Sequence, residues 1–434
     1  MVKIDTTKSF CPKCMKVLDA DIVSKRGIVY IRKKCDEHGS FEVRHSWDQE
    51  KIYKMMAKIP KFDTPDSLVL HITSKCNQNC PFCYAMANDN KYELSMNRIK
   101  NILKKFKGKW ILLSGGEPTV REDVFDIIKL VKKMKFKALL CTNGKKLADE
   151  EFVKKLKDSG LDVVNLQFDS LNDKTYLKLR GQRLLENKMK ALKNLKKYKI
   201  DTTLFVMLIK NINIKEIRNI LNFASKNTDF IKIIYLERAW KVGRTLQHKD
   251  TNSSDVIKEL KKQANINSNE IIEVAEFYHY LHVILKKMKG TDALENAGCE
   301  LNCFIMFKGN EVVPLSRILF IKKINTVLKF VYGNKFFIPM KTIVSIPYIS
   351  YILFKSFVEK KYFRAALNEF IKLRKGVSLK TFDSPFTQLI IRVEPEREDV
   401  DLNICKNYNF YSDIIDSDNI IPAYYRHMII NKLK

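Results

Sequence analysis

Three cysteines in one short stretch constrain this chain more than any other feature of its sequence. Cys76, Cys80 and Cys83 follow a C-x3-C-x2-C spacing. Three close thiolates indicate an iron–sulfur centre, because soft sulfur ligands suit such clusters. Three protein ligands would leave the fourth iron of a four-iron cluster open to a small molecule. The alternative is a structural metal clip, which is disfavoured because no fourth ligand follows nearby in the sequence.

A glycine-rich motif follows the cysteines. The apolar run 111–113 leads into Gly115, Gly116, Glu117 and Pro118. A short apolar run that ends in two glycines predicts a buried strand leaving into a tight loop. Because glycine has no Cβ atom, we expect this loop to let the backbone approach a ligand closely.

Together these two motifs resemble the radical S-adenosylmethionine (radical SAM) superfamily, and the aromatic Phe82 before the third cysteine agrees with it. The resemblance implies that the three cysteines hold a [4Fe-4S] cluster and carry the catalytic step, the reductive cleavage of S-adenosylmethionine. It also implies that the Gly115–Pro118 loop binds the amino group of S-adenosylmethionine, with Phe82 and Tyr84 beside the cofactor. A low-potential electron donor, such as a ferredoxin, is the implied partner.

The stretch from residue 61 to residue 288 alternates apolar runs with amphipathic helices. Repeated strand–helix units predict a parallel sheet or barrel. Six units match the partial (β/α)6 barrel of radical SAM enzymes, so the expected fold class is α/β with a partial TIM-type barrel. In such barrels the chemistry lies at the carboxyl ends of the strands. The expected strands are 68–72, 111–113, 138–141, 163–166, 203–207 and 231–235.

Four polar residues stand at or after the expected strand ends, namely Asn143, Gln167, Asp169 and Arg180. In the resembled superfamily such groups contact the ribose, the carboxylate and the sulfonium of S-adenosylmethionine. The resemblance therefore implies that Asp169 or Gln167 bonds the ribose and that Arg180 pairs with the carboxylate. The alternative for each residue is a turn or a helix cap, since Asn-Gly and Asp-Ser pairs are common there.

Residues 1–60 predict a separate small metal-binding module. Cys11 and Cys14 form one ligand pair, and Cys35 and His38 form a second. Two ligand pairs on turns match a zinc-ribbon or rubredoxin-like site, in which four protein ligands close the metal to chemistry. The spacing does not separate zinc from iron, and His38 has the alternative of an ordinary turn residue.

Residues 289–434 differ in character and predict a mixed, helix-rich C-terminal region. Cys299 and Cys303 form a C-x3-C pair, and Cys405 follows far downstream. Together they could hold an auxiliary [4Fe-4S] cluster. The alternative is three unrelated thiols.

An apolar, basic stretch lies between these cysteines. The segment 315–330 mixes Ile, Leu and Phe with basic residues, and 336–354 is nearly uncharged. Pro339 and Pro347 argue against a single spanning helix, so the pattern favours an amphipathic segment in the membrane interface. The alternative is a helical cap on the barrel or a lid over an apolar substrate channel.

The formal net charge of +30 favours an anionic partner, and an anionic lipid or membrane surface is expected ahead of nucleic acid. A lysine-biased proteome is the alternative explanation. The N-terminus lacks the apolar core of a signal peptide. Ten cysteines, clustered at ligand spacings, indicate metal sites rather than disulfides. We therefore expect a cytoplasmic protein, either free or peripheral at the inner membrane face.

The order of the modules narrows the resemblance. The N-terminal cysteine module before the cluster motif, and Lys241–Arg244 after the sixth strand, look like the archaeal tetraether lipid synthase group and its pterin methyltransferase-like relatives. The C-terminal part departs from that pattern, with Tyr408 and Tyr424 where the group carries histidine and cysteine.

This narrower resemblance implies hydrogen abstraction from an unactivated carbon. The main expectation is an isoprenoid membrane lipid that undergoes C–C coupling or a related modification. The alternatives are radical methylation or another modification of a pterin or a peptide. Outside catalysis, an iron–sulfur carrier or a zinc-ribbon nucleic-acid binder is the competing class.

Overall fold

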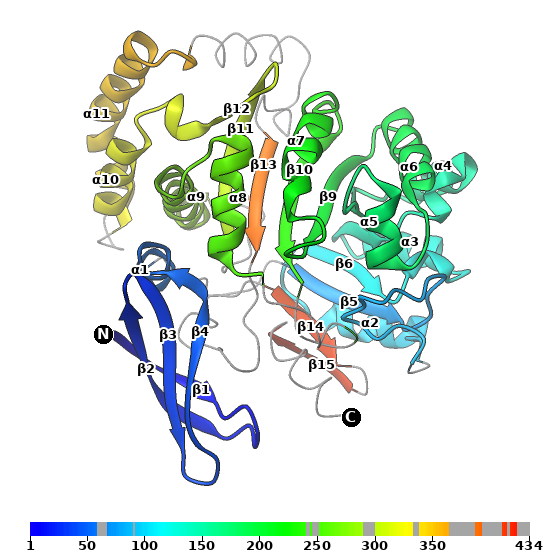
Figure 1. Ribbon diagram of the computed structural model, residues 1–434. Helices are drawn as coiled ribbons and strands as arrows, with labels where there is room; N and C mark the ends of the chain where they lie inside the picture. Colours follow the sequence, from blue (N-terminus) through cyan, green and yellow to red (C-terminus); the bar gives the residue numbers. More distant parts are fainter. Residues whose placement is uncertain are drawn as a thin grey trace.

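A computed structural model of the chain describes residues 1–58, 67–89, 92–239, 244, 251–289, 300–332, 338–363, 387–392, 410–414 and 417–422. These residues form two sheets (Figure 1). A four-stranded antiparallel sheet lies at the N-terminus. An eleven-stranded mixed sheet with flanking helices follows it, and this larger sheet positions the candidate site.

The N-terminal module is an antiparallel meander of four strands and one helix. Burial alternates along its third strand, as expected where one face packs on a core. Arg26 and Gly27 have φ angles of 52° and 79°, which produce the tight turn before that strand. Sequence reasoning found the last two strands and missed the first two, whose exposed positions carry many polar side chains. The elements are β1 (Val2–Phe10), β2 (Val17–Lys25), β3 (Ile28–Cys35), β4 (Gly39–Gln49) and α1 (Glu50–Lys58).

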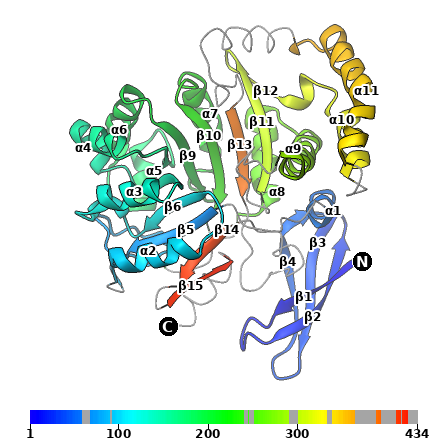
Figure 2. The ribbon, with the colours of Figure 1, turned by 180° about the vertical axis from the view of Figure 1, so that it is seen from behind.

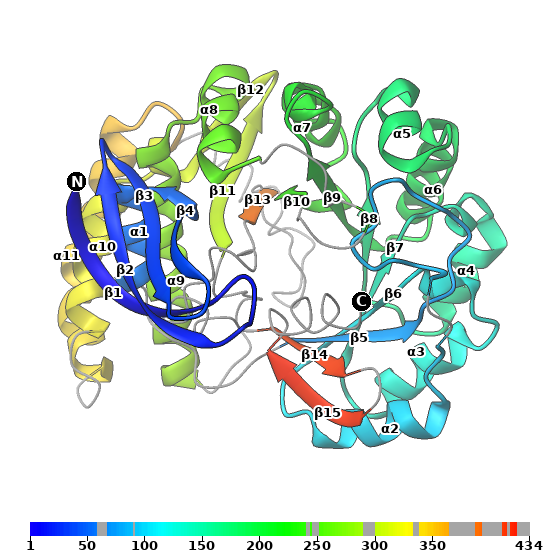
Figure 3. The same cartoon turned by 60° about the horizontal axis from the view of Figure 1, so that its bottom comes forward.

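Six parallel strands in sequence order form the centre of the larger sheet, and all six expected strands are present. Their apolar residues are largely buried, as parallel strands covered by helices require. Figure 3 shows the strands in a curved row with the helices outside it. The prediction of a partial α/β barrel is confirmed. The strands are β5 (Ser67–Thr73), β6 (Trp110–Gly115), β7 (Lys137–Thr142), β8 (Val163–Gln167), β9 (Asp201–Leu208) and β10 (Ile231–Arg238). The helices between and after them are α2 (Met96–Lys105), α3 (Val124–Lys133), α4 (Glu150–Asp158), α5 (Asp173–Arg180), α6 (Leu185–Lys197), α7 (Ile217–Ser225) and α8 (Ser253–Ala264).

The C-terminal region widens this sheet on both edges. Strand β13 (Thr387–Arg392) runs parallel to β10, and β14 (Phe410–Ile414) runs parallel to β5. Antiparallel strands β11 (Glu300–Lys308), β12 (Glu311–Pro314) and β15 (Ser417–Pro422) complete the two ends. The edges of the six-stranded unit would otherwise present unpaired backbone groups, and these added strands cover them. Sequence patterns located the six central strands but not these partners.

Three helices cover the β11 end of the sheet, namely α9 (Ser268–Lys289), α10 (Ile321–Tyr332) and α11 (Ile338–Glu359) (Figure 2). Helix α11 continues through both prolines without a break. Pro339 lies in the first turn, where proline is tolerated, and Pro347 lies inside the helix. Tyr351 and Phe354 of α11 are exposed. Among the described residues, no helix combines the length and the apolar character that crossing a membrane requires.

A buried polar network joins the N-terminal module to the barrel. The Asp48 carboxylate of β4 accepts hydrogen bonds from the hydroxyls of Ser253 and Ser254, at 2.9 and 2.6 Å, at the start of α8. The Arg238 guanidinium, at the end of β10, donates to the Ser46 hydroxyl of β4 at 2.9 Å. Because these groups are buried and paired across the contact, the module is fixed against the carboxyl end of the barrel.

Candidate functional site

A cavity of about 270 Å³ lies at the carboxyl ends of the six central strands. This is the end at which parallel barrels carry their chemistry. Most of the residues predicted for the barrel site line this cavity, and the two exceptions are Pro118 and Asp169. The predicted residues in the lining are Cys76, Cys80, Phe82, Cys83, Tyr84, Gly115, Gly116, Glu117, Asn143, Gln167 and Arg180.

The cysteine loop after β5 is held in shape by backbone and amide hydrogen bonds. The Asn88 side chain accepts from the Cys76 N–H at 2.8 Å and donates to the Cys76 carbonyl at 3.2 Å. Two sulfur atoms accept backbone N–H groups, Cys76 Sγ from Gln78 at 3.4 Å and Cys83 Sγ from Ala87 at 3.5 Å. Such N–H···S bonds stabilise thiolates, so the loop is built to present sulfur ligands.

Arg244, which lies far from the cysteine loop in the sequence, forms several hydrogen bonds with that loop. Its guanidinium donates to the Asn79 side chain at 2.7 Å and to the Ala87 carbonyl at 2.7 Å. Its backbone N–H donates to the Cys83 carbonyl at 3.0 Å. One arginine therefore ties together the middle and the end of the cysteine loop.

The Gly115–Pro118 loop packs directly on the cysteine loop. The Gly116 N–H donates to the Thr73 carbonyl at 2.8 Å, and the Glu117 N–H donates to the Lys75 carbonyl at 2.9 Å. A Cβ atom would lie 2.1 Å from the Thr73 carbonyl oxygen at Gly115 and 2.4 Å from the Lys75 carbonyl oxygen at Gly116. The two glycines thus allow the backbones of the two loops to pack against each other. This contact explains the need for glycine more directly than the approach of a ligand does.

Glu117 connects this loop to the end of β7. Its carboxylate is 1% exposed and accepts from the Thr119 hydroxyl at 2.5 Å and the Thr142 hydroxyl at 2.7 Å, both through Oε1. Its Oε2 accepts from the Asn143 N–H at 2.6 Å. Oε1 also accepts the Thr119 N–H at 3.2 Å, whereas Oε2 accepts one bond from the described residues and so retains capacity for a donor from a ligand. Pro118 begins the short 3-10 turn Pro118–Val120 and stays behind the lining.

Asp169 and Arg180 form a buried ion pair behind the cavity wall. Asp169 is fully buried and receives Arg180 Nε at 2.7 Å and an Arg180 terminal nitrogen at 3.0 Å. It also accepts from the Met207 N–H at 3.2 Å and from the Gln167 amide. The expectation that Asp169 bonds a ribose is therefore revised, because its oxygens are already enclosed and occupied. Arg180 reaches the cavity, and its first partner is Asp169.

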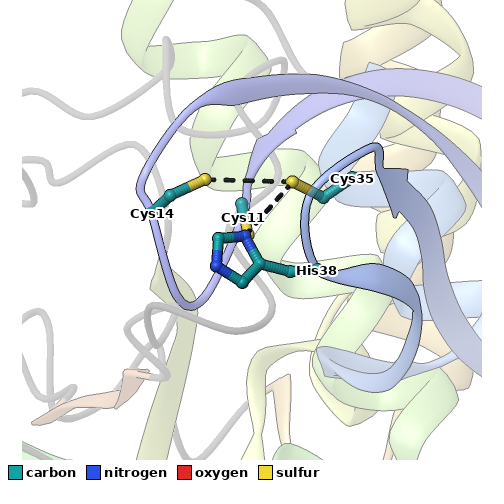
Figure 4. Close-up of side chains that lie close together, drawn as sticks. All are labelled: Cys11, Cys14, Cys35 and His38. Carbon is teal, nitrogen blue, oxygen red and sulfur yellow. Dashed lines mark hydrogen bonds between the residues drawn. The ribbon is translucent and has the colours of Figure 1, made fainter.

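Figure 4 shows the predicted N-terminal ligands converging between two turns of the module. The four ligand atoms of Cys11, Cys14, Cys35 and His38 all lie within 4.8 Å of one another. The Cys14 and Cys35 sulfurs are 3.8 Å apart, and His38 Nδ1 lies 3.5 Å from the Cys35 sulfur. Zinc bound to tetrahedral sulfur at about 2.3 Å requires a sulfur–sulfur separation of about 3.8 Å. The donor set therefore fits one tetrahedral metal ion, and His38 lies where a fourth ligand belongs.

The thiols of this N-terminal site influence one another. Burial raises the pKa of Cys11, but the backbone N–H groups of Cys14 and Lys13 oppose it, and the net effect lowers the pKa to about 6. A lowered thiol pKa favours the thiolate that a metal ion binds. The backbone N–H of Lys16 lowers the pKa of Cys14, but burial and the thiols of Cys11 and Cys35 raise it more. The pKa values of Cys11 and Cys14 therefore shift in opposite directions.

Comparisons with known proteins agree with both sites. Residues 70–224 match the family model of the radical SAM superfamily, and residues 3–46 match the model of the HMPTM N-terminal zinc ribbon domain. Over residues 70–224 the chain is therefore similar to the radical SAM superfamily. The resemblance seen in its sequence is thereby confirmed.

Two curated relatives of the chain are archaeal. The chain is 33% identical over 310 residues to a 7,8-dihydro-6-hydroxymethylpterin dimethyltransferase of Methanocaldococcus jannaschii, covering 63% of this chain and 60% of that protein. It is 30% identical over 184 residues to a probable GTP 3',8-cyclase of Thermococcus kodakarensis, covering 41% and 59%. The chain thus spans about three fifths of the length of these relatives. Among solved structures, Streptococcus suis SuiB bound to S-adenosylmethionine aligns with a TM-score of 0.41 and 20% identity over 49% of each chain.

Two further properties of the cavity residues concern ligand binding, namely a buried amide without a partner and the raised pKa values of two cysteines. The Gln78 side-chain nitrogen is buried in the lining and has no hydrogen-bond partner among the described residues. Burial raises the pKa of Cys76 to about 12, and it also raises the pKa of Cys80, where Arg180 opposes the shift. Without a metal these thiols are protonated, so loading a cluster on them releases protons.

Lys188 supports the radical SAM site and was missed by sequence reasoning. This fully buried residue of α6 donates to the Asn143 carbonyl at 2.5 Å, the Gln167 carbonyl at 2.6 Å and Gln167 Oε1 at 2.8 Å. It therefore joins the ends of β7 and β8. Burial lowers its pKa to about 7, and Asp169 opposes the shift. In a helix with several lysines, nothing in the sequence marks this one as buried.

Several further polar side chains of the cavity were also not predicted. His71 of β5, Asn165 of β8 and Glu237 of β10 line it, and they lie on strands whose apolar character alone had been recognised. The alternation of a strand that ends at the site was the available signal. Each falls an even number of residues from another lining position on its strand.

The C-terminal cysteines predicted for an auxiliary cluster do not line this cavity among the described residues. Cys303 is fully buried in the hydrophobic core of β11, and burial raises its pKa to about 12. It packs there as a small apolar side chain does. Cys299 and Cys405 lie outside the described residues, so the auxiliary cluster stays a prediction.

Proposed function

We propose that this chain is a radical SAM enzyme that modifies carbon on a nitrogen heterocycle of the pterin type. The observation that carries the proposal is the shared lining. The three cysteines, the Gly115–Pro118 loop and Arg180 all reach one cavity at the carboxyl end of the barrel. Polar groups converging on a concave site of this kind are the expected mark of an active site.

In this proposal Cys76, Cys80 and Cys83 hold a [4Fe-4S] cluster, with one iron left for S-adenosylmethionine. When bound and reduced by one electron from an external donor, this pair would supply reductive cleavage of S-adenosylmethionine, with methionine as the leaving group and a carbon radical able to abstract hydrogen. Glu117 Oε2 accepts a hydrogen bond from the methionine ammonium, because the Thr119 and Thr142 hydroxyls already occupy Oε1.

The remaining residues position the cofactor and shield it. Arg180 places positive charge at the cavity edge, and Asp169 fixes the plane of its guanidinium. Lys188 fixes the carbonyls of Asn143 and Gln167, so the side chains of both residues have defined positions for the nucleoside. Phe82, which is 5% exposed, limits the access of water to the cluster side of the cavity.

The choice of substrate class differs from the main sequence-based expectation. An isoprenoid lipid was expected first, and the relatives give it no support. They are named for reactions on a hydroxymethylpterin and on GTP. Pterins and guanine share a 2-amino-4-oxopyrimidine ring, which makes this chemistry the common feature. The pterin alternative is therefore the better supported one, and methylation is one reaction consistent with it.

Partners and location follow from the same proposal. A radical SAM enzyme needs a low-potential electron donor such as a ferredoxin, and its cluster needs reducing surroundings, as in the cytoplasm. The net charge of +30 would attract an acidic electron carrier as readily as an anionic lipid. The described chain also exposes several large apolar side chains on α11.

Anaerobic reconstitution tests the proposal. The chain is loaded with iron and sulfide, reduced with dithionite and given S-adenosylmethionine, with and without 7,8-dihydro-6-hydroxymethylpterin. We expect 5′-deoxyadenosine above the level of a variant in which all three cluster cysteines are alanine, and the pterin should raise it. Isoprenoid lipid extract serves as the competing substrate. Stimulation by lipid and not by pterin would reject the substrate class, and no 5′-deoxyadenosine would reject the enzyme.

A further inference from the structure

The cavity wall formed by β8, β9 and β10 carries side chains that neither cofactor loop uses. Asn165, Phe205, Tyr235 and Glu237 all line the cavity. They come from three adjacent strands of the sheet. Phe205 and Tyr235 share one register position, and Asn165 and Glu237 lie two residues from that position on opposite sides of it. The side chains of this wall indicate which kind of ligand could bind there.

Two aromatic rings form the flat part of the wall. Phe205 and Tyr235 are register partners on β9 and β10, and their ring centroids lie 5.6 Å apart with planes inclined by 22°. The Tyr235 hydroxyl donates to the Glu300 carboxylate at 2.7 Å, which holds that ring in place. Because the two rings stack on each other, they offer their edges and one outer face to the cavity, and a planar apolar ring system can pack against such a surface.

The same wall offers hydrogen-bond acceptors. Glu237 is 3% exposed and brings a carboxylate to the lining. The Asn165 side-chain oxygen is buried and has no hydrogen-bond partner among the described residues. The Asn165 nitrogen lies 3.9 Å from the Cys141 sulfur, which directs the amide within the wall. Because a buried acceptor without a donor is costly, the Asn165 oxygen favours a ligand that carries N–H groups.

We propose that this wall binds the amino-pyrimidinone edge of the substrate, a step that rests on the proposed function. The Glu237 carboxylate accepts two parallel hydrogen bonds, one from the ring N–H and one from the exocyclic amino group. A carboxylate matches such a pair of donors because its two oxygens lie in one plane. The Phe205 and Tyr235 rings pack along the heterocycle, and Asn165 Oδ1 accepts a further N–H. Glu237 is thus a specificity-determining residue.

Equilibrium dialysis under anaerobic conditions tests this site without relying on turnover. The reconstituted protein with S-adenosylmethionine is titrated with 7,8-dihydro-6-hydroxymethylpterin. We expect Glu237→Gln to weaken pterin binding about tenfold, because the amide turns one acceptor into a donor. S-adenosylmethionine should bind this variant as it binds the natural chain. Glu259→Gln is the matched control, because Glu259 lies on α8 and bonds Gln263 outside the lining.

A second ligand and a second variant sharpen the test. 6-Hydroxymethyl-7,8-dihydrolumazine, in which oxygen replaces the amino group of the pterin, should bind the natural chain more weakly than the pterin, and Glu237→Gln should reduce that preference. Asn165→Ala should also weaken pterin binding, which covers the case that the first variant does not fold. Pterin affinity unchanged in Glu237→Gln would overturn the site.

A parallel titration with GTP distinguishes whether the amino-pyrimidinone ring that binds belongs to a pterin or to a guanine nucleotide. Binding of GTP rather than pterin, with the same dependence on Glu237, would retain the site and move the substrate to a guanine nucleotide. Binding of neither ligand by the natural chain would reject both the site and the proposed substrate class. Production of 5′-deoxyadenosine is measured separately and would still stand.

Discussion

The Arg180 guanidinium meets the Asp169 carboxylate in a two-bonded ion pair, with nitrogen–oxygen distances of 2.7 and 3.0 Å. The pair connects α5 to the end of β8, and another Arg180 nitrogen donates to the Phe82 carbonyl at 3.3 Å. One buried contact thus couples the strand end to the cysteine loop. Burial would lower the pKa of Arg180, and the Asp169 carboxylate more than offsets this effect.

Replacing Asp169 with asparagine should destabilise the protein strongly. The variant leaves a guanidinium that is buried and has lost its charged partner, a change that costs about 3–5 kcal/mol in comparable sites. Urea unfolding of the metal-free chain measures the free energy directly. Glu186→Gln is the control, because it removes the exposed pair with Lys190 and should leave the midpoint unchanged. A midpoint for Asp169→Asn equal to that of the control would contradict the role of this pair.

Sequence patterns predicted the features that depend on residues close together in the chain. The spacing of Cys76, Cys80 and Cys83 and the apolar run before Gly115 depend on neighbours in the chain, and both were placed correctly at the cavity. The contacts of Asp169 could not be predicted from the sequence. A carboxylate at a strand end has the same local sequence pattern whether it faces a ligand or an arginine. Lys188 shows the same limit, because its burial results from the packing of α6 onto two strand ends.

The added strands of the sheet had a different reason for being missed. Strands β13 and β14 come from segments that follow the barrel in sequence, yet they pair with β10 and β5. Pairing of that kind depends on which edges the finished sheet leaves open, and no periodicity reports it. The pattern of β13, Thr387–Arg392, is a short apolar run like many others.

Arg244 should control how firmly the cluster loop retains iron. Lysine at this position keeps the charge but cannot bond the Asn79 side chain and the Ala87 carbonyl together. We expect iron release to a chelator from reconstituted Arg244→Lys to be about tenfold faster, as for the loss of one charged hydrogen bond. Arg183→Lys, at an exposed position between α5 and α6, should release iron at the natural rate. Equal rates in both variants would mean that the loop does not depend on the arginine.

Lys188 should make stability depend on pH. Its pKa is about 7 in the folded protein, against about 10.4 for an unfolded lysine. Between these values the unfolded chain binds the extra proton, so stability rises as pH rises, by about 1.4 kcal/mol per pH unit. Lys188→Met lacks this titration. We expect the stability of the natural chain relative to this variant to increase from pH 7 to pH 9 in urea unfolding of the metal-free protein. A difference that stays flat would show that the three oxygen acceptors keep the ammonium charged.

The N-terminal site should hold one metal ion whose role is structural. Cys11→Ala removes one of four converging ligands, so the variant should lose one metal equivalent and unfold more easily, because a structural metal contributes folding free energy. The iron–sulfur absorbance of the barrel should persist, since the cluster cysteines lie in a separate loop. Metal analysis of the isolated protein also identifies the ion as zinc or iron. Lys13→Ala, an exposed change in the same turn, is the control and should retain the metal. If Cys11→Ala keeps its full metal content, the four residues do not form a metal site.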